Sequence, residues 1–192
     1  MEALINYIDS LRPLSEEERG VIVGSFQAGY FAEGDYLFRG GRVCNQFFFI
    51  VSGIVRMVAV NDKGVEVTHF FVHENQFCTI LASFNNETVA EDSIQCCGPV
   101  EALSIEKTRL LALYGVLPFM EGLIAQVNQE RLLDKIRLKN IYSGEDSTGR
   151  YRLFLREQPE IAGRVSLGQV ASYLNITPQS LSRIRRRLRS GV

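Results

Sequence analysis

The sequence predicts an α+β protein with an antiparallel β-roll, one long helix and a C-terminal pair of short helices. Short β-branched and aromatic runs separated by Gly, Asn and Asp fill residues 29–105, a pattern typical of an antiparallel roll or barrel. Residues 118–142 instead repeat apolar side chains at helical spacing, and two short helical patterns joined by a turn follow. We therefore expect three domains or segments, at residues 1–117, 118–142 and 143–192.

Helices are expected to precede the roll. Leu4, Ile5 and Ile8 recur at helical spacing, and Ser15 followed by three glutamates is typical of a helix start, where a hydroxyl caps the first turn and acids favour the positive end of the helix dipole. The pattern predicts helical structure over residues 2–29.

Turn signals separate six predicted strands within the roll. Gly34, Gly40, Gly41 and Gly53 lie where the chain must reverse tightly, which glycine permits because it has no Cβ. The segment Asn61–Gly64 is typical of a hairpin turn. The predicted strands cover residues 36–38, 46–51, 54–60, 65–72, 94–97 and 100–105.

Pro118 suits the first turn of the long helix, which is expected to end near Tyr142. Its apolar positions are Met120, Leu123, Ile124, Val127, Leu132, Leu133, Ile136 and Ile141. A helix between two domains has little to bury such a stripe against except a twin helix, so we predict a homodimer that joins along residues 118–142. The alternative is packing against its own roll. Residues 143–149 are the expected hinge, and a further helix should end before Pro159.

Composition and sequence pattern bear on where in the cell the protein is found. The chain has 192 residues and is 46% hydrophobic, which is enough for a substantial core. No stretch approaches the roughly 20 apolar residues that span a bilayer. The N-terminus lacks the basic and apolar regions of a signal peptide. We expect a cytoplasmic protein without membrane contact.

The four cysteines are Cys44, Cys78, Cys96 and Cys97. They form no C-x-x-C pair and have no histidine at finger spacing, so we expect no structural zinc. We interpret them as buried thiols of a reducing cytosol. A redox sensor at Cys96 and Cys97 is the alternative, which is disfavoured because adjacent cysteines bridge only with strain.

The net charge of −1 conceals an asymmetry. Residues 1–140 hold 12 Lys and Arg against 18 Asp and Glu, whereas residues 141–192 hold 9 against 4. A basic end on an acidic body indicates a polyanionic partner at that end, although an ordinary solvated face is an alternative on charge alone.

The C-terminal pattern is that of a helix-turn-helix. Ser166 is the expected N-cap of the first helix, which should bury Leu167, Val170, Ala171 and Leu174. Asn175 tolerates the left-handed conformation that ends a helix. Thr177 should cap the second helix, with Pro178 in its first turn. The inward residues of this second helix are Leu181, Ile184 and Leu188.

The outward face of the second helix carries the residue types that read DNA. We expect Arg183 to offer two donors to a guanine edge and Gln179 to pair with adenine. Ser180 and the helix N-termini suit phosphate oxygens. Five arginines and no acid follow Thr177. The predicted DNA-binding residues are Ser166, Thr177, Gln179, Ser180, Ser182, Arg183, Arg186 and Arg187.

This layout resembles the Crp/Fnr, or catabolite-activator, family of bacterial transcriptional regulators. Residues 31–41 and 49–56 resemble the glycine-turn signatures of its roll, and residues 171–187 resemble its recognition module. The resemblance implies a cyclic-nucleotide-binding-type jelly roll, a dimerisation helix and a DNA-binding helix-turn-helix. Pro178 stands where better-known members place a base-reading arginine, so their target sequence does not transfer.

The resemblance also implies where an effector would bind. Members that bind cyclic nucleotides hold the phosphate with an arginine in a short helical cassette. The corresponding residues 75–93 contain no Arg or Lys but do contain Glu87, Glu91 and Asp92, so we predict no cyclic nucleotide. For an unidentified neutral effector, the pocket residues would be Phe77, Ser83, Glu87 and Thr88.

Other sensor chemistries of the family are not expected. An iron–sulfur cluster needs cysteines near the N-terminus, and Cys44 is the first; His69 and His73 are interpreted as surface or turn histidines rather than haem or metal ligands. We expect no cofactor and no enzyme activity, because no nucleophile–base pair or phosphate loop is present. The predicted function is sequence-specific DNA binding by a transcriptional regulator. The roll either senses a ligand or serves as a scaffold and contact surface for RNA polymerase. The alternative function is a ligand-binding sensory module whose DNA contacts are secondary.

Overall fold

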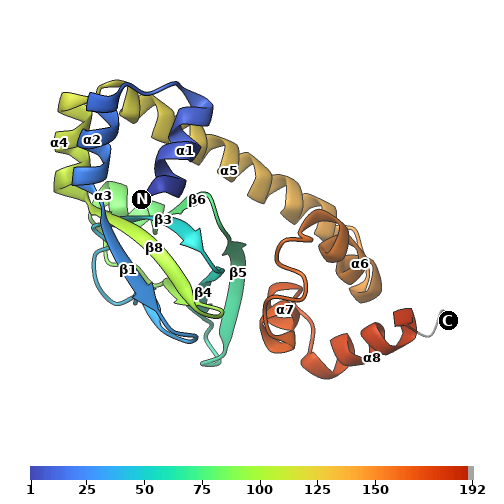
Figure 1. The fold of residues 1–192 in the computed structure, drawn as a ribbon. Helices are drawn as coiled ribbons and strands as arrows, with labels where there is room; N and C mark the ends of the chain where they lie inside the picture. Colours follow the sequence, from blue (N-terminus) through green and yellow to red (C-terminus); the bar gives the residue numbers. More distant parts are fainter. Residues whose placement is uncertain (190–192) are drawn as a thin grey trace.

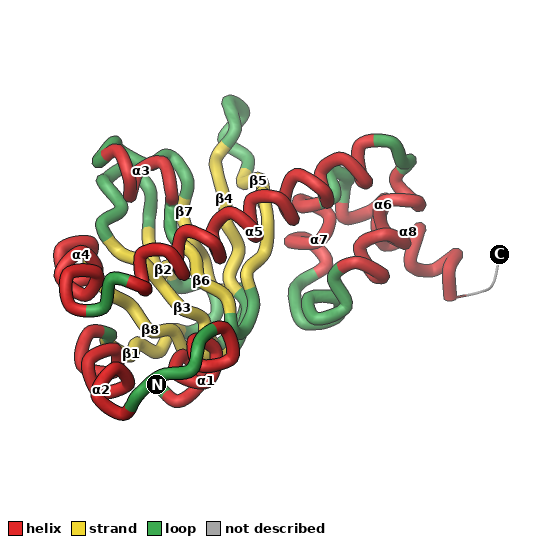
Figure 2. Tube along the Cα trace, turned by 90° about the horizontal axis from the view of Figure 1, so that it is seen from above, coloured by secondary structure: helices red, strands yellow, loops and turns green. Residues whose placement is uncertain are grey.

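The structure of the protein is a computed structural model that describes residues 1–189 (Figure 1). A β-roll with N-terminal helices lies at one end of the molecule, and three short helices lie at the other. The long helix α5, Phe119–Ser143, connects the two (Figures 1 and 2). The predicted α+β class is confirmed, because antiparallel sheets and separate helices make up the described chain.

Two four-stranded antiparallel sheets form the roll. In spatial order, the first sheet contains β1 (Gln27–Phe31), β8 (Val100–Glu106), β3 (Gln46–Ser52) and β6 (Gln76–Cys78). The second contains β2 (Tyr36–Phe38), β7 (Ser93–Cys96), β4 (Val55–Val60) and β5 (Glu66–Val72). Strand β5 is therefore an edge strand. Alternate side chains of both sheets meet in a core that includes Phe48, Ile50, Met57 and Ile94.

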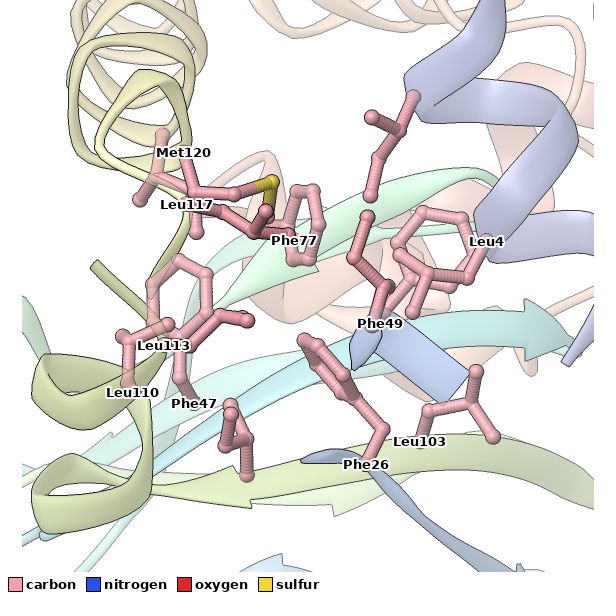
Figure 3. Packing of buried hydrophobic residues seen from close by; sticks show 14 of the residues in the cluster. Leu4, Phe26, Phe47, Phe49, Phe77, Leu103, Leu110, Leu113, Leu117 and Met120 are labelled. Atoms are coloured by element: carbon pink, nitrogen blue, oxygen red, sulfur yellow. The ribbon is translucent and has the colours of Figure 1, made fainter. Parts of the chain in front are cut away.

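A second core lies on the other side of the first sheet, beneath the helices (Figure 3). It joins the sheet to α1 (Glu2–Leu11), α2 (Glu16–Ser25), α4 (Lys107–Val116) and the start of α5. Phe47, Phe49 and Phe77 meet at its centre, with ring centroids 4.9 and 5.3 Å apart for the pairs that include Phe77. Aromatic rings at these spacings add edge and stacking interactions to the hydrophobic effect.

Several local predictions are confirmed. Ser15 caps α2 in a reciprocal hydrogen-bond arrangement with Glu18, as the run of glutamates indicated. The Asn61–Gly64 turn joins β4 to β5, with the Asn61 amide donating to the Val65 carbonyl at 3.0 Å. Gly53 has φ +92°, and a Cβ there would lie 2.3 Å from the Pro99 carbonyl oxygen, so the β3–β4 turn requires glycine.

Other local predictions were wrong or incomplete. Helical structure does not extend to residue 29, because the chain enters β1 at Gln27, which pairs with Ser104 of β8. Strand β6 was missed because its residues were assigned to the effector cassette that the family resemblance implied. Helix α4 was missed although it buries Leu110 and Leu113 at helical spacing. Helix α3, Leu81–Asn86, lies within the stretch that the family resemblance placed at the effector cassette.

Helix α5 has two apolar faces. Met120, Ile124 and Val127 are at most 4% exposed and pack on the roll, so the alternative of packing against its own roll holds for the N-terminal half. Leu132, Leu133 and Ile136 are 48–59% exposed. At 100° per residue these three lie on the side of the helix opposite the buried row.

Three helices follow the predicted hinge: α6 (Ser147–Glu157), α7 (Leu167–Tyr173) and α8 (Pro178–Arg189). We call them the C-terminal unit. Their core contains Tyr151, Phe154, Ala171 and Leu181, and it also contains roll residues Ile54, Phe71 and Cys97. Helix α7 contacts strand β5, and α8 lies on the far side of α7 from the roll (Figure 1). The unit is thus docked on the edge strand of the second sheet.

Candidate nucleic-acid interface

The first helix of the candidate interface begins as the sequence predicted. The Ser166 hydroxyl accepts from the Gln169 amide at 3.2 Å, and the Gln169 side chain accepts from the Ser166 amide at 2.9 Å. This reciprocal cap fixes the direction in which the chain enters α7. Ala171 is fully buried between the helices, where a larger side chain would separate them.

The turn between α7 and α8 also has its predicted chemistry. Asn175 adopts φ +55°, the left-handed conformation that stops α7. Thr177 Oγ1 accepts from the Ser180 amide at 3.1 Å, and its hydroxyl lies 3.0 Å from that of Ser180. Pro178 occupies the first position of α8, which lacks an intrahelical amide partner in any helix.

Helix α8 divides into an inner and an outer face. Leu181 and Ile184 are at most 7% exposed and hold the helix against α7 and α6. Gln179, Ser182 and Arg183 are exposed, as are Arg186 and Arg187. Ser180 is half-buried and takes part in the cap, because its backbone amide donates to the Thr177 hydroxyl. The outer face therefore carries amide, hydroxyl and guanidinium groups without a carboxylate from its own helix.

Contacts with β5, which sequence reasoning missed, fix the position of this face. The Ser172 hydroxyl accepts from the Thr68 amide at 2.9 Å and donates to the Glu66 carbonyl at 3.3 Å. It therefore satisfies two backbone groups that an edge strand would otherwise leave to water. The Tyr173 ring lies 5.2 Å from that of Phe71. No motif signals such contacts, because they join residues about a hundred positions apart in the chain.

An ion pair adds a third contact between the roll and the C-terminal unit. The Arg164 guanidinium donates to both carboxylate oxygens of Glu74, at 2.5 and 3.0 Å. Glu74 Oε1 also accepts from the Gly53 amide at 2.8 Å. The hydrogen bonds from Arg164 lower the pKa of Glu74 to about 2. Charge-assisted bidentate pairing thus joins the loop before α7 to the loop after β5.

The buried guanidinium of Arg56 lies in the sheet that carries this contact. Its nitrogens donate to Gln95 Oε1 at 2.6 and 2.9 Å, to Thr68 Oγ1 at 3.0 Å and to the Glu66 carboxylate. Thr68 and Glu66 are the residues whose backbone bonds to Ser172. Arg56 therefore orders the segment of β5 on which α7 sits. An arginine in an otherwise apolar strand was the signal available in the sequence.

The residues predicted for an effector pocket differ in burial: Phe77 and Ser83 are buried, whereas Glu87 and Thr88 are exposed. Phe77 is buried in the core beneath the helices (Figure 3). The Ser83 hydroxyl accepts from the Cys44 amide at 2.8 Å and donates to the Thr88 carbonyl. Glu87 is exposed and pairs with Lys107 at 2.9 Å, which lowers the pKa of its carboxyl. Thr88 is exposed as well. Internal partners thus already engage the polar groups of Ser83 and Glu87.

All four cysteines are buried thiols without a disulfide bond, as interpreted from the sequence. Burial raises the pKa of Cys78, Cys96 and Cys97 to about 12, which disfavours the reactive thiolate. Over residues 1–189, no group of three or more His, Cys, Asp or Glu side chains has the proximity to hold a metal ion. None of the helices in that range combines the length and hydrophobicity needed to cross a bilayer.

Known proteins share this architecture. Residues 28–115 match the cyclic nucleotide-binding domain family. Among solved structures, the c-di-GMP-responsive global regulator CLP of Xanthomonas campestris has a TM-score of 0.73 at 18% identity, covering 92% of this chain and 93% of that one. FixK2 of Bradyrhizobium japonicum has a TM-score of 0.73 at 13% identity, covering 86% and 85%. No sequence among the curated proteins matches the chain.

A third structure carries the family name in its description. It is described as a transcriptional regulator of the Crp/Fnr family from Eubacterium rectale, with a TM-score of 0.69, 18% identity and coverage of 97% of this chain and 88% of that one. The roll therefore resembles the cyclic nucleotide-binding domain, whose family model covers residues 28–115. The chain as a whole has the fold of the Crp/Fnr regulators, and the resemblance stated from the sequence is confirmed.

Proposed function

We propose that the protein is a homodimeric, sequence-specific DNA-binding transcriptional regulator and that α7 and α8 form its helix-turn-helix. The supporting observation is the exposed outer face of α8, on a helix that lies on the far side of α7 from the roll (Figure 1). A helix with such a face fits the major groove of B-DNA. The regulator fold shared with CLP and FixK2 supports the same role.

Each predicted contact residue has a role in this proposal. Gln179 and Arg183 read base edges, since their planar groups form paired hydrogen bonds with adenine and guanine. Arg186 and Arg187 contact the phosphate backbone where α8 leaves the groove. The starts of α7 and α8, marked by Ser166 and by Thr177 with Ser180, lie against phosphates, which the positive ends of the helix dipoles attract. Ser182 completes the exposed face.

The exposed apolar face of α5 supports the dimer. Leu132, Leu133 and Ile136 are half exposed or more, and they lie opposite the row that packs on the roll. A twin helix would cover them and place two α8 helices about a two-fold axis. Two such helices read half-sites about 10 bp apart, or one turn of the duplex. Ile136→Glu should convert the dimer to a monomer in light scattering, whereas Leu111→Glu, at an exposed leucine of α4, should not.

DNA binding itself is tested with fluorescently labelled genomic fragments in a titration at several salt concentrations. We expect salt-dependent binding of a preferred fragment, because counterions leave the phosphates when arginines bind. Arg183→Ala should weaken the binding of that fragment by roughly tenfold or more, because a base contact contributes about 1–3 kcal/mol. The matched control is Arg39→Ala, which removes an exposed roll arginine that lies over Tyr36.

The rival function makes the opposite prediction. A sensory module with secondary DNA contacts would bind a small molecule while no genomic fragment is retained, and Arg183→Ala would change nothing. The lack of Arg and Lys in residues 75–93 supports a regulator that does not respond to cyclic AMP. Within the proposal the protein is cytoplasmic and without catalytic activity, and its roll faces an effector or RNA polymerase.

A further inference from the structure

Helix α5 contacts the roll through apolar side chains first and through a polar one further along. Met120, Ile124 and Val127 of its first half are buried in the core beneath the helices. One turn after Val127 the same row continues with Arg131, whose guanidinium donates to the side-chain oxygen of Gln76 in β6. The row thus changes from apolar to cationic as α5 runs from the roll toward the C-terminal unit (Figures 1 and 2).

The side-chain amide of Gln76 is oriented by partners at both of its ends. Its oxygen accepts from Arg131 and from the backbone amide of His73, the latter at 3.2 Å. Its nitrogen lies 2.6 Å from His73 Nε2, in the turn between β5 and β6. The reversed amide would point its N–H groups at two donors, so the nitrogen must face the imidazole ring. An amide nitrogen only donates, and His73 Nε2 is therefore an acceptor without a proton.

The charges around His73 also favour its neutral form. Burial, followed by the positive charge of Arg131 on α5, lowers the pKa of His73 below its ordinary value of 6.5. Two acids act in the opposite direction: Glu160, in the segment between α6 and α7, and the neighbouring Glu74. Arg164 of the same segment lowers the pKa of His73 and is paired with Glu74. The net effect of these surroundings is to disfavour the imidazolium.

A proton on His73 would break this arrangement. The ring lines a cavity of about 680 Å³ between the roll and the C-terminal unit, through which solvent protons reach it. Protonated Nε2 and the Gln76 nitrogen are both donors, so Gln76 has to turn and its oxygen leaves Arg131. Within residues 1–189, no carboxylate lies within ion-pair distance of Arg131 to replace that oxygen. The guanidinium would then face a second cation.

We propose that His73 is a proton switch that controls the attachment of α5 to the roll. The neutral ring orients Gln76, and Gln76 binds Arg131. The protonated ring turns Gln76 away and releases α5 at Arg131. Because α5 leads into the C-terminal unit, the switch acts on the helix that carries this unit. The proposal does not require that the protein bind DNA, since all of its groups belong to the roll and its neighbours.

The test is a pH titration of the nitrogen-15-labelled full chain, without DNA, followed by NMR. The signals observed are those of the His73 imidazole and of the Arg131 side-chain N–H groups. At pH 8 we expect neutral His73 with its proton on Nδ1. The titration midpoint of His73 should lie below 6.5, and the Arg131 signals should shift along the same curve.

Variants separate the switch from a general effect of pH. His73→Gln keeps an acceptor for Gln76 but does not titrate, so the Arg131 signals should stay constant from pH 8 to 5. The matched control is His69→Gln, at an exposed histidine of β5, which should leave the Arg131 curve unchanged. Gln76→Glu replaces the donor with a second acceptor and should raise the His73 midpoint by about one unit or more.

Three outcomes overturn the proposal. They are a His73 midpoint of 6.5 or higher in the unmodified chain, Arg131 signals that still follow pH in His73→Gln, and an unchanged His73 midpoint in Gln76→Glu. Circular dichroism checks the folding of each variant, and if His73→Gln does not fold, the Gln76→Glu titration decides. Failure of DNA binding, measured separately, overturns the proposed function and leaves this result intact.

Discussion

The roll and its contact with the C-terminal unit are held together by different chemistry. The roll packs on aromatic and aliphatic side chains that are almost fully buried, with Phe47, Phe49 and Leu103 at its centre (Figure 3). The contact with the C-terminal unit combines one serine hydroxyl and one ion pair with a smaller apolar patch, in which Ile54, Phe71 and Cys97 of the roll join the core of the unit.

This difference in packing indicates which part of the molecule moves. Opening the roll exposes a continuous apolar core, whereas undocking the unit exposes a smaller apolar patch together with polar groups that water can satisfy. The second process therefore has the lower free energy, and we expect the C-terminal unit to leave β5 while the roll stays folded. A regulator that repositions its DNA-reading helix needs this division between a rigid body and an exchangeable contact.

The largest effect is expected from a cavity in the roll. Phe49→Ala removes a fully buried ring that contacts Phe77 and Tyr7. The free energy of unfolding should fall by roughly 3–5 kcal/mol, the usual cost of a Phe→Ala cavity. Urea denaturation followed by circular dichroism measures it. A loss below about 1 kcal/mol would contradict the view that the roll core sets global stability.

Thiol labelling compares the roll core with the contact between the roll and the C-terminal unit, because one of two adjacent cysteines lies in each. Cys96 lies between the sheets, whereas Cys97 lies beneath the C-terminal unit beside Ile54 and Phe71. In urea below the unfolding transition, we expect Cys97 to be labelled at least tenfold faster than Cys96, as measured by tandem mass spectrometry. The two should react alike in full denaturant. Equal rates below the transition would show that the unit undocks only when the roll unfolds.

The comparison also explains how much of the molecule was predictable from its sequence. Caps and turns were predictable, because Ser166, Asn175 and Thr177 act on backbone groups within a few residues of themselves. The long helix was placed within one residue at each end. Strand β1 was not recognised, because its residues are largely exposed and its hydrogen-bonded partner β8 lies about 70 positions further along the chain. Helix α4 was overlooked although Leu110 and Leu113 have helical spacing.

The same limit applies to the sites. The exposed face of α8 could be read from its own periodicity, and the exposures of Gln179 and Arg183 agree with it. No role was predicted from the sequence for Arg131 and Lys135 of α5. Their partners, Gln76 for Arg131 and Phe70 for Lys135, belong to the roll and come close only in the folded chain.

A smaller effect is expected from the hydroxyl that docks α7. Ser172→Ala leaves the Thr68 amide and the Glu66 carbonyl of β5 without their partner. Undocking should become easier by roughly 1–2 kcal/mol, and labelling of Cys97 should accelerate about tenfold while that of Cys96 is unchanged. Ser182→Ala, on the exposed face of α8, is the matched control and should have no effect. Slower or unchanged Cys97 labelling would remove Ser172 from the docking contact.

The smallest effect is expected from the ion pair, and it depends on pH. Arg164 holds the pKa of Glu74 at about 2, below its ordinary value of 4.5. A carboxyl with a lowered folded-state pKa stabilises docking above about pH 4.5, and this contribution is lost as the pH falls from 4.5 toward 2. The Arg164 side chain is 45% exposed, so solvent limits the effect to less than about 1 kcal/mol.

Glu74→Gln tests this contribution, because glutamine keeps an acceptor for the Gly53 amide but loses the charge. At pH 7 the variant should exchange the Thr68 amide faster with solvent than the unmodified chain, and at pH 3 the difference should shrink. Rates are compared after correction for the intrinsic pH dependence of exchange. Glu160→Gln is the control, since no described cation pairs with that carboxylate. A difference that stays constant from pH 7 to 3 would mean that the Glu74 charge does not hold the unit on β5, and that Ser172 and the Phe71–Tyr173 contact suffice.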